Sequence, residues 1–216
     1  MALPRALRNH LAELTLNSLH DPEARHELAA VVRFCREAAE SRTVPDGPAD
    51  RGRELFEDAA GRPFFDEAYR PFRGEFCERA ERAWEVVRGR PLSRPGVGLG
   101  EALSAAADLF DARLFYEVHE LLEPYWMWAE GTTREALQGL IQIAVGFHHL
   151  GNNNLDGARM LLEEGRSKVE GNCLEGRELT GFARALRRSL ETLTTLGKAA
   201  SGAFDWSQVP RFPRGD

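Results

Sequence analysis

The sequence predicts an all-α protein, an antiparallel helical bundle with an N-terminal helical extension. Almost every segment repeats apolar residues at helical spacing, and no segment alternates apolar and polar residues for long enough to favour a strand. The breaks between helical segments are short, so successive helices are expected to be antiparallel neighbours. The chain of 216 residues is 43% hydrophobic and 29% charged, which is ordinary for a folded protein.

In the first half of the chain, helices are expected on both sides of a linker. Asp21 followed by Pro22 has the pattern of a cap and a first-turn proline, which begins a helix. The linker is the stretch 43–48, which contains two prolines and a glycine. Pro71 interrupts the last of these helices early. The helices expected here span residues 2–19, 21–41, 50–61 and 66–88.

A second stretch rich in Pro and Gly, residues 89–100, precedes a bundle of five helices. Asn154 is expected to cap the fourth of them. The tail from Gly202 onward is expected to be irregular, with Trp206 and Phe212 packed. The five helices are expected at 101–110, 114–129, 133–150, 155–169 and 177–197. The chain therefore divides into an N-terminal helical pair (1–48), a helical extension with a Pro- and Gly-rich loop (49–98), a helical bundle (99–200) and an irregular tail (201–216).

Charge and composition limit the classes of partner and the cellular compartment that we expect. With 28 basic and 34 acidic residues the net charge is −6, so no nucleic-acid partner is expected. The longest apolar stretch, residues 140–147, is interrupted by Gln142 and is far too short to span a membrane, so no membrane partner is expected. The cysteines Cys35, Cys77 and Cys173 are odd in number and far apart, which predicts reduced thiols and a cytoplasmic protein rather than a disulfide framework.

A polar pair lies on the otherwise apolar helix expected at 114–129. His119 and Glu123 are one helical turn apart and share one edge of the core-facing side. Glu117 and Glu120 are expected to face away from the core, toward solvent. The pair is therefore placed where a buried surface meets an accessible one.

The next helix, expected at 133–150, is apolar around most of its circumference and should be central in the bundle. Gly139 and Gly146 in this helix, with Gly157 and Gly165 in the following one, favour close backbone contact, which would offset their low helix propensity. The polar residues of the central helix fall in one stripe of about 100°. They are Arg134, Glu135, Gln138, Gln142 and His149.

The short loop 130–132 determines which residues of the two helices should meet. Pairing outward from this loop places Gln138 and Gln142 level with the polar pair. The same register places His149 near Tyr116. Two polar stripes are therefore expected to meet at one helix–helix interface, which is the strongest functional signal in the sequence.

These segments resemble the family catalogued as domain of unknown function 309, over roughly residues 100–172, about a third of the chain. The resemblance implies a small α-helical bundle and carries no established activity. The stretches that carry it are Phe115–Glu123, Trp126, Leu137–Gln142, Gly151-Asn152 and Gly157-Ala158, and the motif positions are His119, Glu123, Trp126, Gln138 and Gln142.

Several interpretations of this polar cluster are open. It can be a hydrogen-bonded set that only fixes helix packing, because a buried polar group needs a partner. It can line a pocket for a small polar or anionic ligand. It can work as an acid–base dyad of His119 and Glu123. No metal is expected, and the candidates for one are His119, Glu123 and His149. The candidate ligand-binding residues are Tyr116, His119, Glu123, Trp126, Gln138, Gln142 and His149.

We expect a non-enzymatic helical module that binds a partner protein or a small polar ligand through this cluster. The alternative is a hydrolase that uses the His119–Glu123 dyad, with or without a metal. No cofactor is expected, because the sequence has no phosphate-binding glycine loop and no nucleophile motif. The sequence also allows a homo-oligomer.

Overall fold

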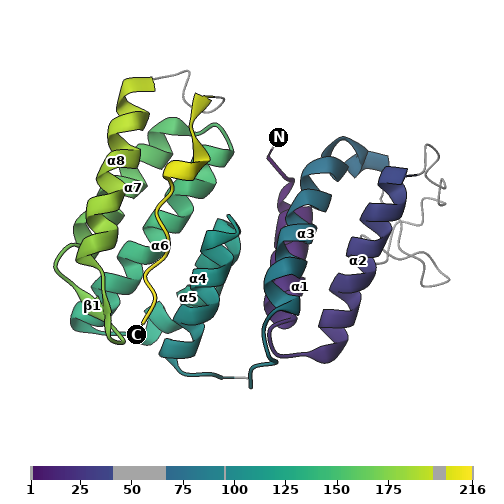
Figure 1. The fold of residues 1–216 in the computed structure, drawn as a ribbon, viewed down its shortest axis with the longest axis horizontal. Coiled ribbons are helices and arrows are strands. Elements are labelled where there is room, and N and C mark those ends of the chain that lie inside the picture. The colour runs from purple at the N-terminus through teal and green to yellow at the C-terminus, as the bar shows by residue number, and fades with distance from the viewer. Residues whose placement is uncertain (1, 41–66, 95, 197–202, 216) are drawn as a thin grey trace. The chain divides into compact units, whose positions relative to one another are not determined.

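The computed structural model describes residues 2–40, 67–94, 96–196 and 203–215, and it confirms the all-α fold class (Figure 1). The chain forms two compact units, Met1–Pro95 and Gly96–Asp216. No helix in the described ranges has the length and apolar character needed to cross a bilayer. The expected linker at 43–48 and the expected helix at 50–61 lie outside the described residues.

The described residues of the first unit form three α-helices and a short 3-10 segment. They are α1 (Arg5–Asn17), α2 (Pro22–Glu40), η1 (Glu67–Phe72) and α3 (Arg73–Arg88). Asp21 caps α2 as expected, because its carboxylate accepts the backbone N–H of Glu23 at 2.8 Å. Pro71 lies in η1, directly before α3. Leu7, Leu28 and Phe76 are buried and contribute to the core of this unit.

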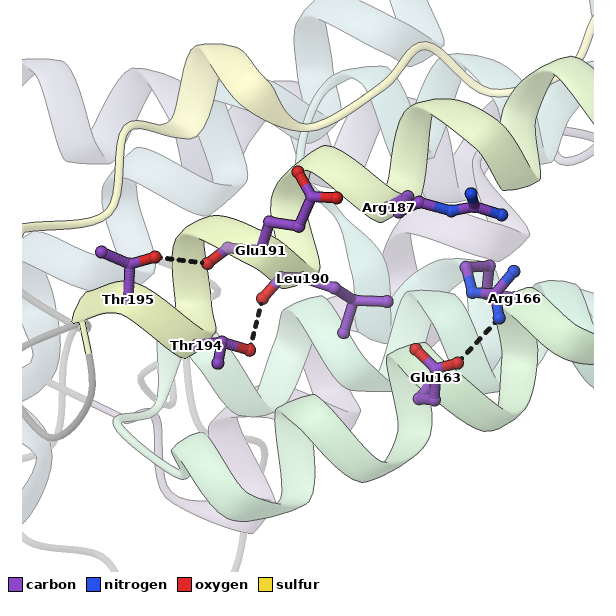
Figure 2. Close-up of a pocket in the computed structure, with 7 residues that line it drawn as sticks. All are labelled: Glu163, Arg166, Arg187, Leu190, Glu191, Thr194 and Thr195. Carbon is purple, nitrogen blue, oxygen red and sulfur yellow. Dashed lines mark hydrogen bonds and ion pairs between the residues drawn. The ribbon is translucent and has the colours of Figure 1, made fainter.

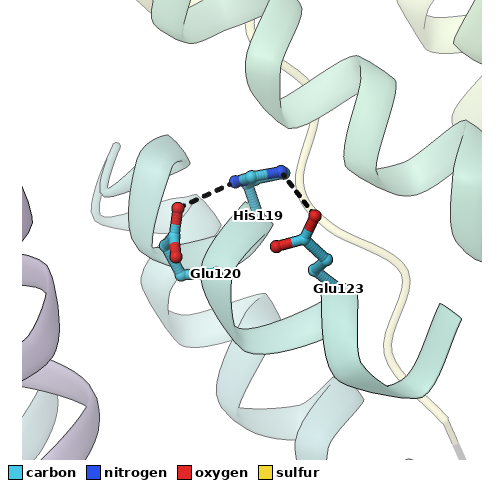
Figure 3. A group of neighbouring side chains, drawn as sticks. All are labelled: His119, Glu120 and Glu123. Carbon is cyan, nitrogen blue, oxygen red and sulfur yellow. Dashed lines mark hydrogen bonds and ion pairs between the residues drawn. The ribbon is translucent and has the colours of Figure 1, made fainter. Parts of the chain in front are cut away.

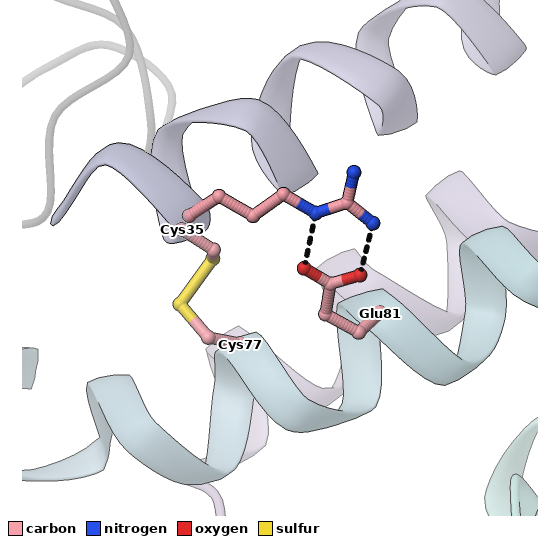
Figure 4. Close-up of a disulfide and its surroundings, with 4 residues drawn as sticks. Cys35, Cys77 and Glu81 are labelled. Atoms are coloured by element: carbon pink, nitrogen blue, oxygen red, sulfur yellow. Dashed lines mark hydrogen bonds and ion pairs between the residues drawn. A yellow bond between two sulfur atoms is a disulfide. The ribbon is translucent and has the colours of Figure 1, made fainter. Parts of the chain in front are cut away.

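A disulfide joins α2 and α3 between Cys35 and Cys77, whose Cα atoms are 5.5 Å apart (Figure 4). The expectation of three reduced thiols was therefore wrong, and only Cys173 is free. Beside the disulfide, Arg36 donates two hydrogen bonds of 2.8 and 2.7 Å to the carboxylate of Glu81. The two cysteines are 42 residues apart in sequence, and they meet because α2 and α3 pack against each other.

The described residues of the second unit form a bundle of five α-helices. Each helix packs against the next along the chain, and the central helix α6 lies between α5 and α7. Two of its glycines meet α7 closely: Gly139 faces Gly165, and Gly146 faces Leu162. The helices are α4 (Leu99–Asp111), α5 (Phe115–Trp128), α6 (Gly131–Gly151), α7 (Leu155–Val169) and α8 (Thr180–Leu196).

A small antiparallel ladder connects α7 to α8 and was not expected from the sequence. Strand β1 (Cys173–Leu174) pairs with β2 (Arg177–Glu178) through a turn in which Glu175 and Gly176 have φ values of +49° and +75°. Two successive residues with positive φ are typical of a two-residue hairpin. Arg177 anchors this hairpin, because its guanidinium donates to the carbonyl of Gly100 and to the hydroxyl of Ser104, both at 3.0 Å.

The tail packs on the bundle, as expected for its aromatic residues. Phe212 is 2% exposed, and its backbone N–H donates to the carboxylate of Asp111 at 3.1 Å. Trp206 lies in the short 3-10 segment η3 (Trp206–Gln208) and stacks on Phe115, with ring centroids 6.3 Å apart. The described part of the tail is therefore held to the C-terminal end of α4 and the N-terminal end of α5.

Candidate functional site

His119, Glu120 and Glu123 form a cluster on one side of α5 (Figure 3). The neighbouring Val118 and Leu122 are fully buried, so the helix is fixed by its apolar side and presents the cluster at the edge of the core. The side chains of His119, Glu120 and Glu123 are 26%, 35% and 44% exposed. Each can contribute a ligand atom, and these three atoms lie within 4.8 Å of one another. The three side chains are therefore partly buried, but solvent can still reach them.

The two ring nitrogens of His119 have different neighbours. Nδ1 lies 3.1 Å from Oε1 of Glu120, and because an ionised carboxylate only accepts hydrogen bonds, Nδ1 carries the proton. Nε2 lies 3.9 Å from Oε1 of Glu123, which is too long for a hydrogen bond. In the neutral imidazole Nε2 is an acceptor. The ring therefore presents a lone pair toward a carboxylate, and the gap between them suits a cation or a donor.

This spacing is close to that of two ligands on one metal ion. Two ligand atoms about 2.0–2.1 Å from a zinc ion in tetrahedral geometry lie about 3.3 Å apart. The Nε2–Oε1 separation of 3.9 Å is wider by an amount that a side-chain adjustment can close. Glu120 would then act through the ring, because a carboxylate on the second nitrogen orients a metal-bound histidine.

Next to the cluster, Tyr116 lies between two histidines. Its ring centroid is 6.0 Å from that of His119 and 5.6 Å from that of His148. The sequence register expected His149 at this position. The amide of Asn152 donates to Nε2 of His148 at 2.9 Å, which continues the polar surface to the end of α6. The neighbour of Tyr116 is therefore one residue, or about 100° of helix rotation, away from the expected one.

His149 and Gln142 have partners outside the cluster. Nδ1 of His149 lies 2.9 Å from the amide nitrogen of Asn154 at the start of α7. The amide of Gln142 donates to Glu164 of α7 at 2.8 Å. Gln138 is half-buried on α6 and forms no hydrogen bond within the described residues. The composite contact of these glutamines with His119 and Glu123 is therefore not what the structure contains: Gln142 turns to α7.

Trp126 lies one turn beyond Glu123 and is covered by Arg134. The guanidinium carbon of Arg134 is 4.3 Å from the Trp126 ring centroid, and its Nη1 donates to the Trp126 carbonyl at 2.9 Å. The indole Nε1 is buried and has no hydrogen-bond partner in the described part of the chain. Oε1 of Gln142 is buried and unpartnered in the same way. The indole N–H of Trp126 and the amide oxygen of Gln142 are thus left for a ligand or for water.

Two residues of this surface, Glu120 and His148, were not among the predicted site residues. Glu120 was expected to face solvent and instead contacts His119, because an adjacent carboxylate can reach back to the ring. Glu117, expected outward as well, is fully buried. The i, i+1 spacing of His119 and Glu120 was the one signal in the sequence that could have indicated their contact.

A groove of about 440 Å³ lies between α7 and α8, and it differs from this cluster in its chemistry (Figure 2). Arg166 donates to Glu163 at 2.7 Å, and this hydrogen bond holds the pKa of the Glu163 carboxyl below its usual value. The hydroxyls of Thr194 and Thr195 donate to carbonyls of their own helix, both at 2.9 Å. Most polar groups of the groove therefore already have a hydrogen-bond partner within the protein, and few are left for a ligand.

The fold and the site define a helical bundle that carries a His–Glu cluster on its second helix. Residues 103–161, from α4 into α7, match the model of the family described as Domain of unknown function (DUF309). The resemblance seen in the sequence is thus confirmed over this stretch, which is about a quarter of the chain. Comparisons with curated proteins and with solved structures found no match. The matched stretch contains His119, Glu120 and Glu123.

Proposed function

We propose that the bundle is a ligand-binding module and that the cluster of His119, Glu120 and Glu123 binds a small cation, in the first place a divalent metal ion. The observation that carries this proposal is the separation of 3.9 Å between His119 Nε2 and Glu123 Oε1. Both atoms are acceptors when Glu120 holds the proton on Nδ1. A cation between them would satisfy both.

The donor types support a borderline metal over a hard one. An imidazole nitrogen with carboxylate oxygens suits Zn²⁺ or Ni²⁺, whereas Mg²⁺ prefers oxygen donors alone. Only two ligand atoms face the gap, because Glu120 is taken up by Nδ1. The remaining coordination positions would be filled by water or by a ligand that the module recognises, such as a carboxylate or an imidazole of a partner.

A hydrolase is the second candidate, and the same open positions favour it. A metal held by few protein ligands keeps sites for water, whose pKa it lowers so that hydroxide forms near neutral pH. Glu123 could then accept a proton from that water. The binding module ranks first because it requires only a cation between His119 and Glu123, whereas a hydrolase also needs groups that position a substrate.

Isothermal titration of the full chain with Zn²⁺, Ni²⁺ and Mg²⁺ tests the proposal. The exposed thiol of Cys173 can bind zinc by itself, so all proteins carry Cys173→Ser. We expect saturable binding of Zn²⁺ and Ni²⁺ and much weaker binding of Mg²⁺. His119→Gln and Glu123→Gln should each lose at least about tenfold in affinity, and Glu120→Gln should lose about 10–100-fold through the ring orientation.

Two variants serve as matched controls. His149→Gln removes a histidine that is bound to Asn154, and Glu135→Gln removes an exposed carboxylate of α6. Both should bind zinc like the parent protein. If the parent shows no saturable zinc binding, or if His119→Gln binds as tightly as the parent, the proposal is wrong. Hydrolysis of a p-nitrophenyl phosphate diester by the zinc-loaded protein, lost in His119→Gln, would favour the second candidate.

A further inference from the structure

A second site is suggested by a cavity of about 230 Å³ where the tail crosses the end of α4. Its walls include Asp111 and Arg113 from the end of α4 and the turn after it, and Trp206, Ser207 and Arg211 from the tail. This cavity shares no lining residue with the His119 cluster. Two guanidinium groups line it, on a chain whose net charge is −6.

Arg113 has a backbone conformation that normally selects glycine. It follows α4 with φ +60°, while its N–H donates to the carbonyl of Phe110 at 2.8 Å and the N–H of Leu114 to that of Leu109 at 2.9 Å. These two bonds form a Schellman motif, in which the left-handed position is usually glycine because a Cβ is strained there. The chain instead has arginine, so the side chain is expected to have a use that outweighs the strain.

The guanidinium of Arg113 lies over Trp206 and has no hydrogen-bonded anion among the described residues. Its central carbon lies 5.5 Å from the ring centroid of Trp206. It forms no hydrogen bond and no ion pair with any residue that the structure describes. Asp205 interacts with it electrostatically, but this carboxylate already accepts the backbone N–H of Ser207 at 2.9 Å. The donors of Arg113 are therefore available to a ligand.

Arg211 supplies the second positive charge. Its side chain is 83% exposed, and its Nη1 lies 3.3 Å from Oδ2 of Asp111. Asp111 is the one acidic group in the wall, and its charge is compensated further by Arg214 at 3.0 Å and by the N–H of Phe212 at 3.1 Å. The lining itself therefore holds two guanidinium groups and one carboxylate, and Arg214 also pairs with Asp108 at 2.9 Å.

The start of α5 adds to this field. The helix begins two residues after Arg113, no side chain caps it, and its first residue, Phe115, stacks on Trp206 of the cavity wall. The N-terminal end of a helix carries a partial positive charge. The carbonyls at the end of α4, which would repel an anion, are in part occupied by the Schellman bonds.

We propose that this cavity binds a small oxyanion, a phosphate or carboxylate group, between Arg113 and Arg211. The planar fork of a guanidinium matches two oxygens of either group. The volume accommodates the anionic group and only a few further atoms. Trp206, beneath Arg113, forms the apolar part of the wall together with Phe110, Val209 and Pro210.

The proposal is tested with the full chain by calorimetry and tryptophan fluorescence. The probes are inorganic phosphate, phenyl phosphate and benzoate, each at constant ionic strength with chloride as the competing anion. We expect saturable binding of at least one probe, together with a fluorescence change that is absent in Trp206→Phe. Tighter binding of phenyl phosphate than of inorganic phosphate would indicate a phosphate carried by a larger molecule. Tightest binding of benzoate would indicate a carboxylate.

Arg113→Gly is the decisive variant, because glycine is the preferred residue at this backbone position and the fold should be kept. We expect at least about tenfold weaker binding with an unchanged or raised melting temperature. Arg211→Gln should also weaken binding at least about tenfold. The matched control is Asn153→Gly, which makes the same change at the φ +63° position after α6. It should leave anion binding unchanged.

Two results would overturn the proposal. One is the absence of saturable binding of all three probes beyond the effect of chloride. The other is a protein with Arg113→Gly that binds as tightly as the parent, whatever its melting temperature. In the second case, a lowered melting temperature would assign Arg113 to the packing of Trp206.

Discussion

Gly139 and Gly165 touch backbone to backbone where α6 crosses α7. A Cβ atom on Gly139 would lie 2.9 Å from the carbonyl oxygen of Gly165, and a Cβ on Gly165 would lie 2.7 Å from the carbonyl oxygen of Gly139. Both distances are shorter than a carbon–oxygen contact allows. The two helices therefore pack closely only because neither residue has a side chain.

Gly139→Ala and Gly165→Ala should each destabilise the second unit by about 1–3 kcal/mol, because the obstacle is backbone and cannot rotate away. This loss of stability is larger than the gain from the higher helix propensity of alanine, which is at most about 1 kcal/mol. Gly181→Ala in α8 is the control, since no atom lies within 4 Å of its added Cβ. Denaturant unfolding should show it equal to or more stable than the parent. A stable Gly165→Ala protein would contradict the close crossing.

The Cys35–Cys77 disulfide should stabilise the first unit. It closes a loop across 42 residues of sequence, and the chain-entropy relation gives about 4 kcal/mol for a loop of this length. We expect reduction, or the double substitution of both cysteines by alanine, to lower the stability of the first unit by about 2–4 kcal/mol. Cys173→Ala should have little effect. Peptide mapping without reductant should find Cys173 alone alkylated, and alkylation of all three thiols would show that the bond does not form.

Asn154 should stabilise the start of α7. Its side-chain oxygen accepts the N–H of Gly157 at 3.1 Å, and its amide nitrogen lies 2.9 Å from Nδ1 of His149. Asn154→Ala removes both contacts and is expected to cost about 1 kcal/mol in unfolding free energy. Asn154→Asp keeps the capping oxygen and should recover most of that loss. Equal stability of the alanine and aspartate variants would argue that the cap contributes nothing.

Tyr125 should give a pH dependence at the alkaline end. Burial, and then the nearby charge of Glu101, raise the pKa of its phenol, whose hydroxyl donates to the carbonyl of Val97 at 2.9 Å. Because the folded pKa lies above the unfolded one, this contribution to stability is fully present below about pH 10 and is lost as the pH rises through the folded pKa.

The prediction is checked by following phenolate absorbance and unfolding in parallel. One of the three tyrosines should ionise later than the others, and this late step should disappear in Tyr125→Phe. The variant should also lose less stability between pH 9 and 11 than the parent. Ionisation of all three tyrosines in a single step would contradict the prediction.

Most of the helical architecture follows from local signals in the sequence. Periodic apolar residues and end signals such as Asp21 and Asn154 gave helices that begin and end within a few residues of those in the structure. Two helix starts are displaced. The α-helix expected from residue 66 begins at Arg73, after the 3-10 segment η1. Helix α8 begins at Thr180 rather than at Arg177, because Arg177 is part of the hairpin. The hairpin itself depends on positive φ at Glu175, which local propensity does not favour.

The candidate site was only partly predictable, because its contacts depend on helix rotation. The spacing of His119 and Glu123 identified a shared helix face correctly. The register across the loop could not show that α6 turns Gln142 toward Glu164. A helix rotation equivalent to one residue, about 100°, is enough to change which neighbouring helix a side chain contacts. The Cys35–Cys77 bond was missed for a related reason: it needs the packing of two helices that are far apart in the sequence.

Because the tail packs on the bundle, a recombinant fragment of the bundle must include it. The ring of Phe110 has Phe182 of α8 at 5.9 Å and Phe212 of the tail at 5.3 Å. A recombinant fragment trimmed to the family match at 103–161 would lack both and would leave an aromatic surface open to water. Such a fragment should aggregate, whereas one that begins near Gly96 and keeps Arg214 should remain monodisperse.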